Sequence, residues 1–278
     1  MNIIKLAAFS DGSVGGNPAG IVIEEKMPRA MMMRQIASEV GFSETAFAVP
    51  QGDGWRVRYF SPESEVPFCG HATIALGAAL AKIHGAGTFP LQLKASDISV
   101  SGEPVADSDL YTASLTSPPT TSGLASPELR QQALALFGLT SSDLDERVQP
   151  ALMDAGSNEL LLALHNRDTL AAMHYDLNQG KTLMHEAGLV GIHLIHIDEA
   201  GVVHARNAFA SGGVLEDPAT GAAAAALGGY LRDQNYPGYL NGIDIIQGED
   251  MGMRSLLRVE LSDQAGSPVK VSGTVREL

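Results

Sequence analysis

The stretch YFSPESEVPFCGHAT, Tyr59 to Thr73, leads from the end of a strand, through a proline-bounded turn, to the start of a helix. Before it, apolar residues alternate with arginines from Trp55 to Tyr59, the period-two pattern of a half-buried strand. After it, small residues dominate from Ala72 to Ala81. The pattern predicts a helix that neighbouring backbones approach closely.

The same order of signals recurs in LEDPATGAAAAALGGYL, Leu215 to Leu231, where a polar loop again precedes a small-residue helix, here Ala219 to Leu231. Alternation from Leu257 to Leu261 predicts another half-buried strand. The chain of 278 residues is long enough for two domains. The Ser/Thr/Pro-rich stretch 112–127 is the expected connection between them.

Three further segments have helical signals. Residues 28–41 begin with Pro, end with Gly and carry apolar residues at helical spacing. Segments 127–137 and 168–187 are also expected to be helices, the second with Gly180 inside it. The N-terminal MNIIKLAAFS is expected to be a first strand, not a signal sequence.

Composition excludes several classes of function. The net charge of −14 and the absence of a Lys/Arg cluster argue against nucleic acid and membrane partners. An anionic substrate would therefore need local donors, such as the N–H groups at a helix start. The single cysteine, Cys69, rules out an intrachain disulfide and a Cys-based zinc cluster, and it favours a cytoplasmic location.

Glu44 lies in GFSETAFAVP, an otherwise apolar, strand-like segment directly after a helix stop. Burial disfavours the charged form of a carboxyl group and raises its pKa, the condition for proton exchange near neutral pH. The alternative is an edge-strand glutamate that points to solvent, which spacing alone favours.

His71 and Cys69 lie at the start of the first small-residue helix. Free N–H groups there could hold a carboxylate, with His71 as a neighbouring donor. A structural hydrogen bond is an equally good interpretation of His71. For Cys69 we expect a small buried side chain and not a nucleophile.

Asp217 precedes Pro218 at the start of the second small-residue helix. It could cap that helix, the default for an isolated Asp-Pro, or face a ligand held by N–H groups near Thr220 and Gly221. His193 and His196 would point to opposite faces of a strand, so a metal site there, even with His204 nearby, is rejected.

The segment GSVGGNPAG, residues 12–20, lacks the spacing of a phosphate loop and is expected to be a loop that places Asn17 and Pro18 near a site.

Five ordered blocks, GNPAG, SETAF, FSPESEVPFCGHAT, EDPATG and QGEDMGMRS, resemble the PhzF-like family, phenazine-biosynthesis isomerases within the diaminopimelate epimerase fold superfamily. The resemblance implies an α/β (α+β) fold of two similar lobes, each a mixed or antiparallel sheet around a central helix. The lobes would be residues 1–111, completed by about 268–278, and residues 112–267. It also implies a homodimer.

The resemblance implies a cofactor-independent isomerase that shifts a proton on a small carboxylate or amino-carboxylate, of which a cyclic diene is one example, and no metal is expected. Glu44 would be the acid/base, with His71 and Asp217 orienting the substrate and assisting proton return. The substrate-binding residues would be Asn17, Ser43, Gly70, Ala72, Thr220, Gly221 and Ala222. Many members have Ser at the position of Ala222, and the approach from Arg206 to Ser211 also departs from the family pattern.

Epimerases of this fold use two opposed thiols, and this chain has one. A single carboxylate working on one face suits a proton shift or tautomerisation. The alternatives are a non-catalytic small-molecule binder that retains the cleft and a structural or regulatory dimer.

Overall fold

The computed structural model describes residues 1–94 and 97–278 and has a mixed α/β fold. The chain divides into two compact units. Unit 1 comprises residues 1–116 and 272–278, and unit 2 comprises residues 117–271. Within the described residues, no helix is both long and apolar enough to cross a bilayer.

Unit 1 is a sheet wrapped around one long helix. Its elements are β1 (Ile4–Ser10), β2 (Asn17–Ile23), α1 (Ala30–Val40), β3 (Glu44–Gln51), β4 (Gly54–Phe60), β5 (Glu65–Val66), α2 (Gly70–His84), β6 (Gly87–Gln92), β7 (Asp97–Pro104), β8 (Tyr111–Thr116) and most of β17 (Lys270–Glu277). The strand order is β1-β2-β3-β4-β6-β7-β8, and β17 pairs with both β8 and β1. Among the strand pairs of this sheet whose register is described, β2–β3 and β4–β6 are parallel and the others are antiparallel.

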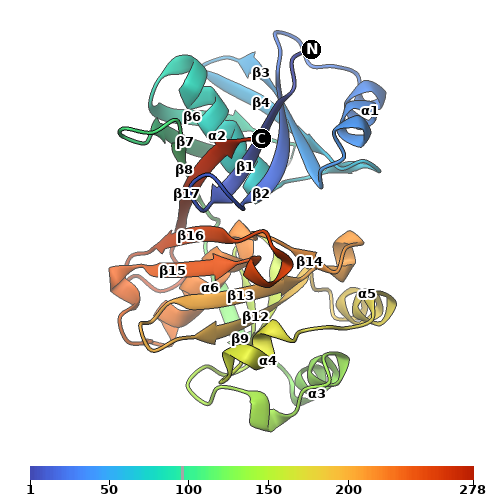
Figure 1. The fold of residues 1–278 in the computed structure, drawn as a ribbon, viewed down its shortest axis with the longest axis vertical. Helices are drawn as coiled ribbons and strands as arrows, with labels where there is room; N and C mark the ends of the chain where they lie inside the picture. Colours follow the sequence, from blue (N-terminus) through green and yellow to red (C-terminus); the bar gives the residue numbers. More distant parts are fainter. Residues whose placement is uncertain (95–96) are drawn as a thin grey trace. The chain divides into compact units, whose positions relative to one another are not determined.

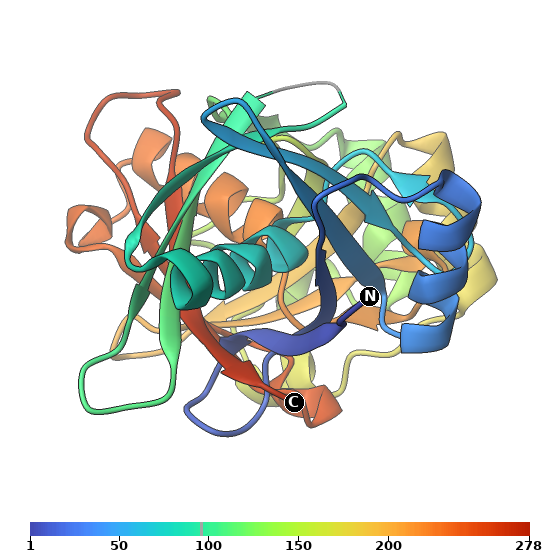
Figure 2. The same ribbon diagram turned by 90° about the horizontal axis from the view of Figure 1, so that it is seen from above.

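Helix α2 is the central element of unit 1 (Figure 2). It packs against β1, β2, β3, β6, β7 and β8, and its residues from His71 to Ala81 are buried. Small residues make this close packing possible. A Cβ on Gly102 would lie 2.4 Å from the backbone oxygen of Gly77, so β7 can approach α2 only with glycine at that position.

Unit 2 contains β9 (Thr121–Leu124), α3 (Pro127–Leu136), β10 (Ala151–Asp154), β11 (Asn158–Ala163), α4 (Arg167–Ala171), α5 (Leu177–Glu186), β12 (Gly191–Ile197), β13 (Val203–Ala208), β14 (Glu216–Asp217), α6 (Gly221–Asp233), β15 (Ile243–Gln247) and β16 (Ser255–Glu260). Four short 3-10 turns complete it: η1 (Ser141–Asp143), η2 (Ala210–Gly212), η3 (Tyr239–Asn241) and η4 (Glu249–Met251). Helix α6 packs against β9, β10, β11 and β16 (Figure 1). A separate apolar cluster joins Leu160, Leu162 and Leu194 of the sheet to buried side chains of α3, α4 and α5.

The two units repeat one pattern of pairing. In unit 1, β2–β3 is parallel and β3–β4 and β4–β5 are antiparallel; in unit 2, β11–β12 is parallel and β12–β13 and β13–β14 are antiparallel. Each set is followed by the buried helix, α2 or α6. An Arg–Glu ion pair joins the last two strands of each set, Arg58 to Glu65 and Arg206 to Glu216. The pattern that the sequence suggested is therefore present in the backbone of each unit.

The secondary-structure expectations were confirmed for most elements. The strands predicted around Trp55 and Leu257 are β4 and β16, and the helices predicted at 28–41 and 127–137 are α1 and α3. The single helix expected over 168–187 was wrong, because the chain forms α4 and α5 with a break between them. Gly180 lies inside α5, where a Cβ would meet the ring of Tyr175 at 2.4 Å, so packing explains this internal glycine.

The loop expected at residues 12–20 was wrong for its last part. Asn17 and Pro18 begin β2 and pair with β1, and so they do not belong to a loop. The two units divide between Thr116 and Ser117, within the stretch 112–127, which also contains the end of β8 and the whole of β9. In both stretches, backbone groups are satisfied by strand pairing, which turn-forming residue types do not reveal.

Candidate active site

Glu44 is the first residue of β3. Helix α1 ends just before it at Gly41, whose φ of 74° is the left-handed geometry that glycine adopts readily. Across the parallel pair β2–β3, Glu44 lies opposite Ala19. Asn17 is two residues before Ala19 and therefore shares its face of the sheet. The side chain of Glu44 is 15% exposed, so it is partly buried and still reachable, and the expectation of a fully solvated edge glutamate was wrong.

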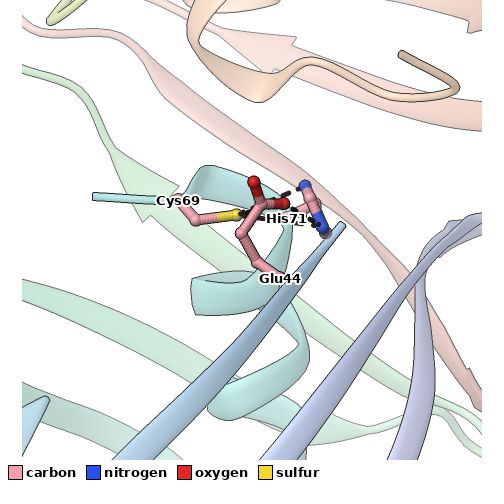
Figure 3. Close-up of side chains that lie close together, drawn as sticks. All are labelled: Glu44, Cys69 and His71. Atoms are coloured by element: carbon pink, nitrogen blue, oxygen red, sulfur yellow. Dashed lines mark hydrogen bonds and ion pairs between the residues drawn. The ribbon is translucent and has the colours of Figure 1, made fainter. Parts of the chain in front are cut away.

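The carboxylate of Glu44 meets the start of α2 (Figure 3). Its Oε2 lies 3.4 Å from Nε2 of His71 and 3.5 Å from Sγ of Cys69. The hydroxyl of Ser43 lies 3.3 Å from the same His71 nitrogen. Both His71 and Cys69 are buried. The arrangement joins a carboxylate, an imidazole and a thiol, each of which can take up or release a proton.

The first turn of α2 adds backbone donors beside these side chains. Cys69 occupies the N-cap position, and the first helical hydrogen bond runs from the N–H of Thr73 to the carbonyl oxygen of Cys69. The N–H groups of Gly70, His71 and Ala72 therefore have no acceptor within the helix. Such groups attract a carboxylate, and the helix dipole adds to this attraction.

A second group of expected site residues lies at the start of α6. Asp217 ends β14, and the hydroxyl of Thr220 donates to its carboxylate. Thr220, and not Asp217, is the N-cap residue of α6, so capping by Asp217 was the wrong interpretation. Gly221 and Ala222 begin the helix, and its first backbone bond runs from the N–H of Ala224 to the oxygen of Thr220.

Gln247 fixes this second group and was not among the expected site residues. It is fully buried at the end of β15. Its amide nitrogen donates to the carbonyl oxygen of Asp217 at 2.8 Å and to Oγ1 of Thr220 at 3.0 Å, and its Oε1 accepts from the N–H of Thr220 at 3.2 Å. The one sequence signal was its place in the QGEDMGMRS block.

Unit 2 also holds a row of buried polar side chains, Glu159, His193 and Asn207, of which only His193 was considered from the sequence. Glu159 lies opposite Gly191, and His193 lies opposite Asn207, which in turn lies opposite Asp217. Burial, with the nearby Asp217 and Asp154 charges adding to it, raises the pKa of Glu159 to about 8. Burial lowers the pKa of His193 to about 4. Both groups are therefore neutral at pH 7.

Several atoms of this row have no hydrogen-bond partner within the described residues. They are Oε2 of Glu159, Nε2 of His193 and Nδ2 of Asn207. A Cβ on Gly191 would lie 2.5 Å from Oε2 of Glu159, so the glycine leaves room for that carboxyl group. The available signal was a charged residue inside the apolar run NELLLAL.

The expected site residues thus form two groups. Unit 1 brings together Ser43, Glu44, Gly70, His71 and Ala72. Asn17 is on the same face of the sheet as Ala19, which lies opposite Glu44. Unit 2 brings together Asp217, Thr220, Gly221 and Ala222. Each group lies where a short strand leads into the start of its unit's buried helix.

The comparisons with known proteins cover nearly the whole chain. The family model for phenazine biosynthesis-like proteins matches residues 6–276. An uncharacterized isomerase of Clostridium acetobutylicum is 28% identical over 281 residues, which cover 97% of this chain and 93% of that protein.

Two solved structures show the same fold. The phenazine biosynthesis protein of the PhzF family from Bacillus anthracis matches with a TM-score of 0.85 and 23% identity, covering 99% of this chain and 96% of that one. The probable proline racemase of Agrobacterium radiobacter matches with a TM-score of 0.67 and 13% identity, covering 99% and 90%.

Proposed function

Because this chain belongs to the family of phenazine biosynthesis-like proteins, we propose that it is an isomerase that shifts a proton on a small substrate with a carboxylate or amino-carboxylate group. Curated relatives of the chain are named uncharacterized isomerases, which supports the general class. The observation that carries the proposal is the position of the Glu44 carboxylate, 3.4 Å from His71 and partly buried beside the start of α2.

Glu44 is the proposed acid/base. A carboxylate held by a neighbouring imidazole can take a proton from an activated carbon and return it to another carbon of the same molecule. Positioned proton transfer of this kind contributes about 10² to 10⁴ in rate, so orientation of the substrate must supply the rest. His71 and Ser43 hold the carboxylate and the substrate in the productive orientation.

The start of α2 is the proposed binding place for the substrate's own carboxylate. The chain carries a net charge of −14, which repels anions at long range. The local N–H groups of Gly70, His71 and Ala72 are therefore the attractive element. In unit 2, Asp217 and the N–H groups of Gly221 and Ala222 stay predicted contacts for polar groups of a substrate.

The thiol content argues against epimerisation by two cysteines. Cys69 is the N-cap residue of α2, and the corresponding N-cap residue of α6 is Thr220. Thr220 has a hydroxyl that already donates to Asp217, and a hydroxyl is a far weaker acid than a thiol. A one-carboxylate proton shift remains the reaction that these residues support best.

The test is a deuterium-incorporation screen. Wild-type protein is incubated in deuterated buffer with small amino acids, hydroxy acids and cyclic diene carboxylates, and each compound is examined by NMR and mass spectrometry. We expect at least one compound to gain deuterium at carbon only when the protein is present. Compounds that raise the melting temperature but never gain deuterium would replace the isomerase with the non-catalytic binder.

A further inference from the structure

We propose that Glu44, Cys69 and His71 form a binding site for one Zn²⁺ ion, and that zinc bound there inhibits the protein. The metal site rests on the side-chain geometry of unit 1. The inhibition rests in addition on the proposed function, because zinc would occupy the carboxylate that the proton shift requires.

The three donor atoms are spaced as the ligands of tetrahedral zinc are spaced. Oε2 of Glu44 lies 3.5 Å from Sγ of Cys69 and 3.4 Å from Nε2 of His71, and the sulfur lies 3.8 Å from that nitrogen. Bonds of about 2.0 to 2.3 Å from a tetrahedral Zn²⁺ ion place its ligand atoms about 3.4 to 3.6 Å apart. The side chains therefore need to move by only a few tenths of an ångström to share one ion.

The donor types select zinc over the common alternatives. A thiolate, an imidazole and a carboxylate are the three ligand classes that zinc uses in proteins. Magnesium and calcium prefer sites made of oxygen atoms, which Cys69 and His71 do not supply. Three protein ligands leave the fourth position for water or for an anion.

The scaffold favours this geometry before any ion arrives. Cys69 and His71 are both buried at the first turn of α2, and Glu44 reaches them from the first residue of β3 (Figure 3). Rigid elements that already hold the donors lower the entropy cost of binding. Across residues 1–94 and 97–278, no other His, Cys, Asp and Glu residues converge in this way.

A single cysteine excludes a zinc cluster built from several cysteines, but not a site in which Cys69 shares one ion with an imidazole and a carboxylate. The metal site that the sequence rejected concerned other residues, His193, His196 and His204. His193 bonds to Asn207 and His196 to the carbonyl oxygen of Leu164. Glu44 and Cys69 are far apart in the sequence, so only the fold reveals that their side chains meet.

The test uses metal-free protein and the metal ions alone. Co²⁺, a spectroscopic substitute for zinc, is added to wild-type protein and to Cys69→Ser, His71→Gln and Glu44→Gln. We expect one equivalent to bind wild type with a thiolate-to-cobalt charge-transfer band, and Zn²⁺ to abolish that band by displacement. Calorimetry should show zinc affinity at least about 100-fold lower in Cys69→Ser and His71→Gln, since changes even in outer-shell groups cost 10- to 100-fold.

His204→Gln is the matched control, because His204 lies beside Asp198 and Glu249 but has no thiol nearby. It should bind zinc as wild type does. The metal site is refuted if the charge-transfer band never forms, or if His204→Gln and not Cys69→Ser loses zinc. If zinc binds at Glu44, Cys69 and His71 without any loss of deuterium exchange, the inhibition is refuted and the metal site is not. Binding is measured without substrate, so its failure leaves the proposed isomerase untouched.

Discussion

Nε2 of His71 lies 3.4 Å from Oε2 of Glu44, although one residue begins a strand and the other belongs to the first turn of a helix. The contact exists because α1 stops at Gly41 and α2 starts directly after Cys69, which brings both side chains to the same end of unit 1. Their contact defines the place where we expect proton transfer.

Replacing His71 with Ala should lower the rate of deuterium exchange by about 10² to 10³, the usual effect of removing one positioned donor from an active site. His84→Ala is the matched control, since His84 is exposed at the other end of the same helix. It should retain the wild-type rate. Equal rates in His71→Ala and wild type would show that the imidazole has no part in the reaction.

Replacing Arg206 with Met should destabilise the protein by about 3 to 5 kcal/mol, because Glu216 would keep a buried, uncompensated charge. The two side chains are only 10% and 6% exposed. Arg206 also donates to the carbonyl oxygens of Ala171 and Met173, so the end of α4 would lose its partners as well. Chemical denaturation measures the difference.

Arg58→Met is the comparison in unit 1. The pair of Arg58 and Glu65 has the same register but is 22% and 25% exposed, so solvent screens it. The expected cost is about 1 kcal/mol. A larger loss in Arg58→Met than in Arg206→Met would contradict the argument from burial.

Glu159→Gln should make the protein more stable than wild type at alkaline pH. The pKa of Glu159 is raised from 4.5 to about 8, so between these values the folded protein holds a proton that the unfolded chain has lost. Stability from this group is complete below the unfolded pKa and is lost as pH rises through 8, by at most about 1.4 kcal/mol per pH unit. From about pH 5 to about pH 9, the melting temperature of Glu159→Gln should rise increasingly above that of wild type.

His193 opposes this trend at lower pH. Its pKa falls from 6.5 to about 4 on folding, so its contribution is present above pH 6.5 and is lost as pH falls toward 4. Where the two pH ranges overlap, Glu159 makes the stability of wild type fall with rising pH and His193 makes it rise. In Glu159→Gln only the effect of His193 is left. Parallel melting curves for the two proteins across the whole range would show that Glu159 is ionised in the folded state.

Gly102→Ala should cost about 1 to 3 kcal/mol, because the added methyl group would meet the backbone of Gly77 at 2.4 Å and force β7 away from α2. Gly87→Ala tests the same change directly across the ladder, where β6 pairs with β7. Its nearest neighbour would be Phe89 at 3.8 Å, an ordinary contact, so the expected change is within about 0.5 kcal/mol. A similar loss in both variants would mean that close helix packing is not the cause.

Much of the fold could be predicted because its signals are local. Alternation marked β4 and β16, and Pro and Gly marked the ends of α1. The break between α4 and α5 was missed: Asp176, which caps α5, was a local signal, but the donation from Arg206 to the carbonyl oxygens of Ala171 and Met173 is a tertiary contact. Small residues identified α2 and α6 as buried helices, because only close neighbours make such a composition stable.

The candidate site was predictable where its residues stand in recognisable blocks, as Glu44 and His71 do. Gln247 and Glu159 were harder to identify. A buried glutamine can be recognised only from the partners that it holds, here Asp217 and Thr220. The buried carboxyl group of Glu159 fits only because Gly191, opposite it on the neighbouring strand, has no side chain. The register of β11 and β12 sets this pairing.

The most direct measurement is deuterium exchange into a responsive substrate by wild type, Glu44→Gln and Glu39→Gln, the last being an exposed glutamate of α1 that serves as control. If Glu44 carries the proton, Glu44→Gln should lose about 10² to 10⁴ in exchange rate while it keeps its melting temperature, and Glu39→Gln should match wild type. Exchange at the wild-type rate by folded Glu44→Gln would contradict the account.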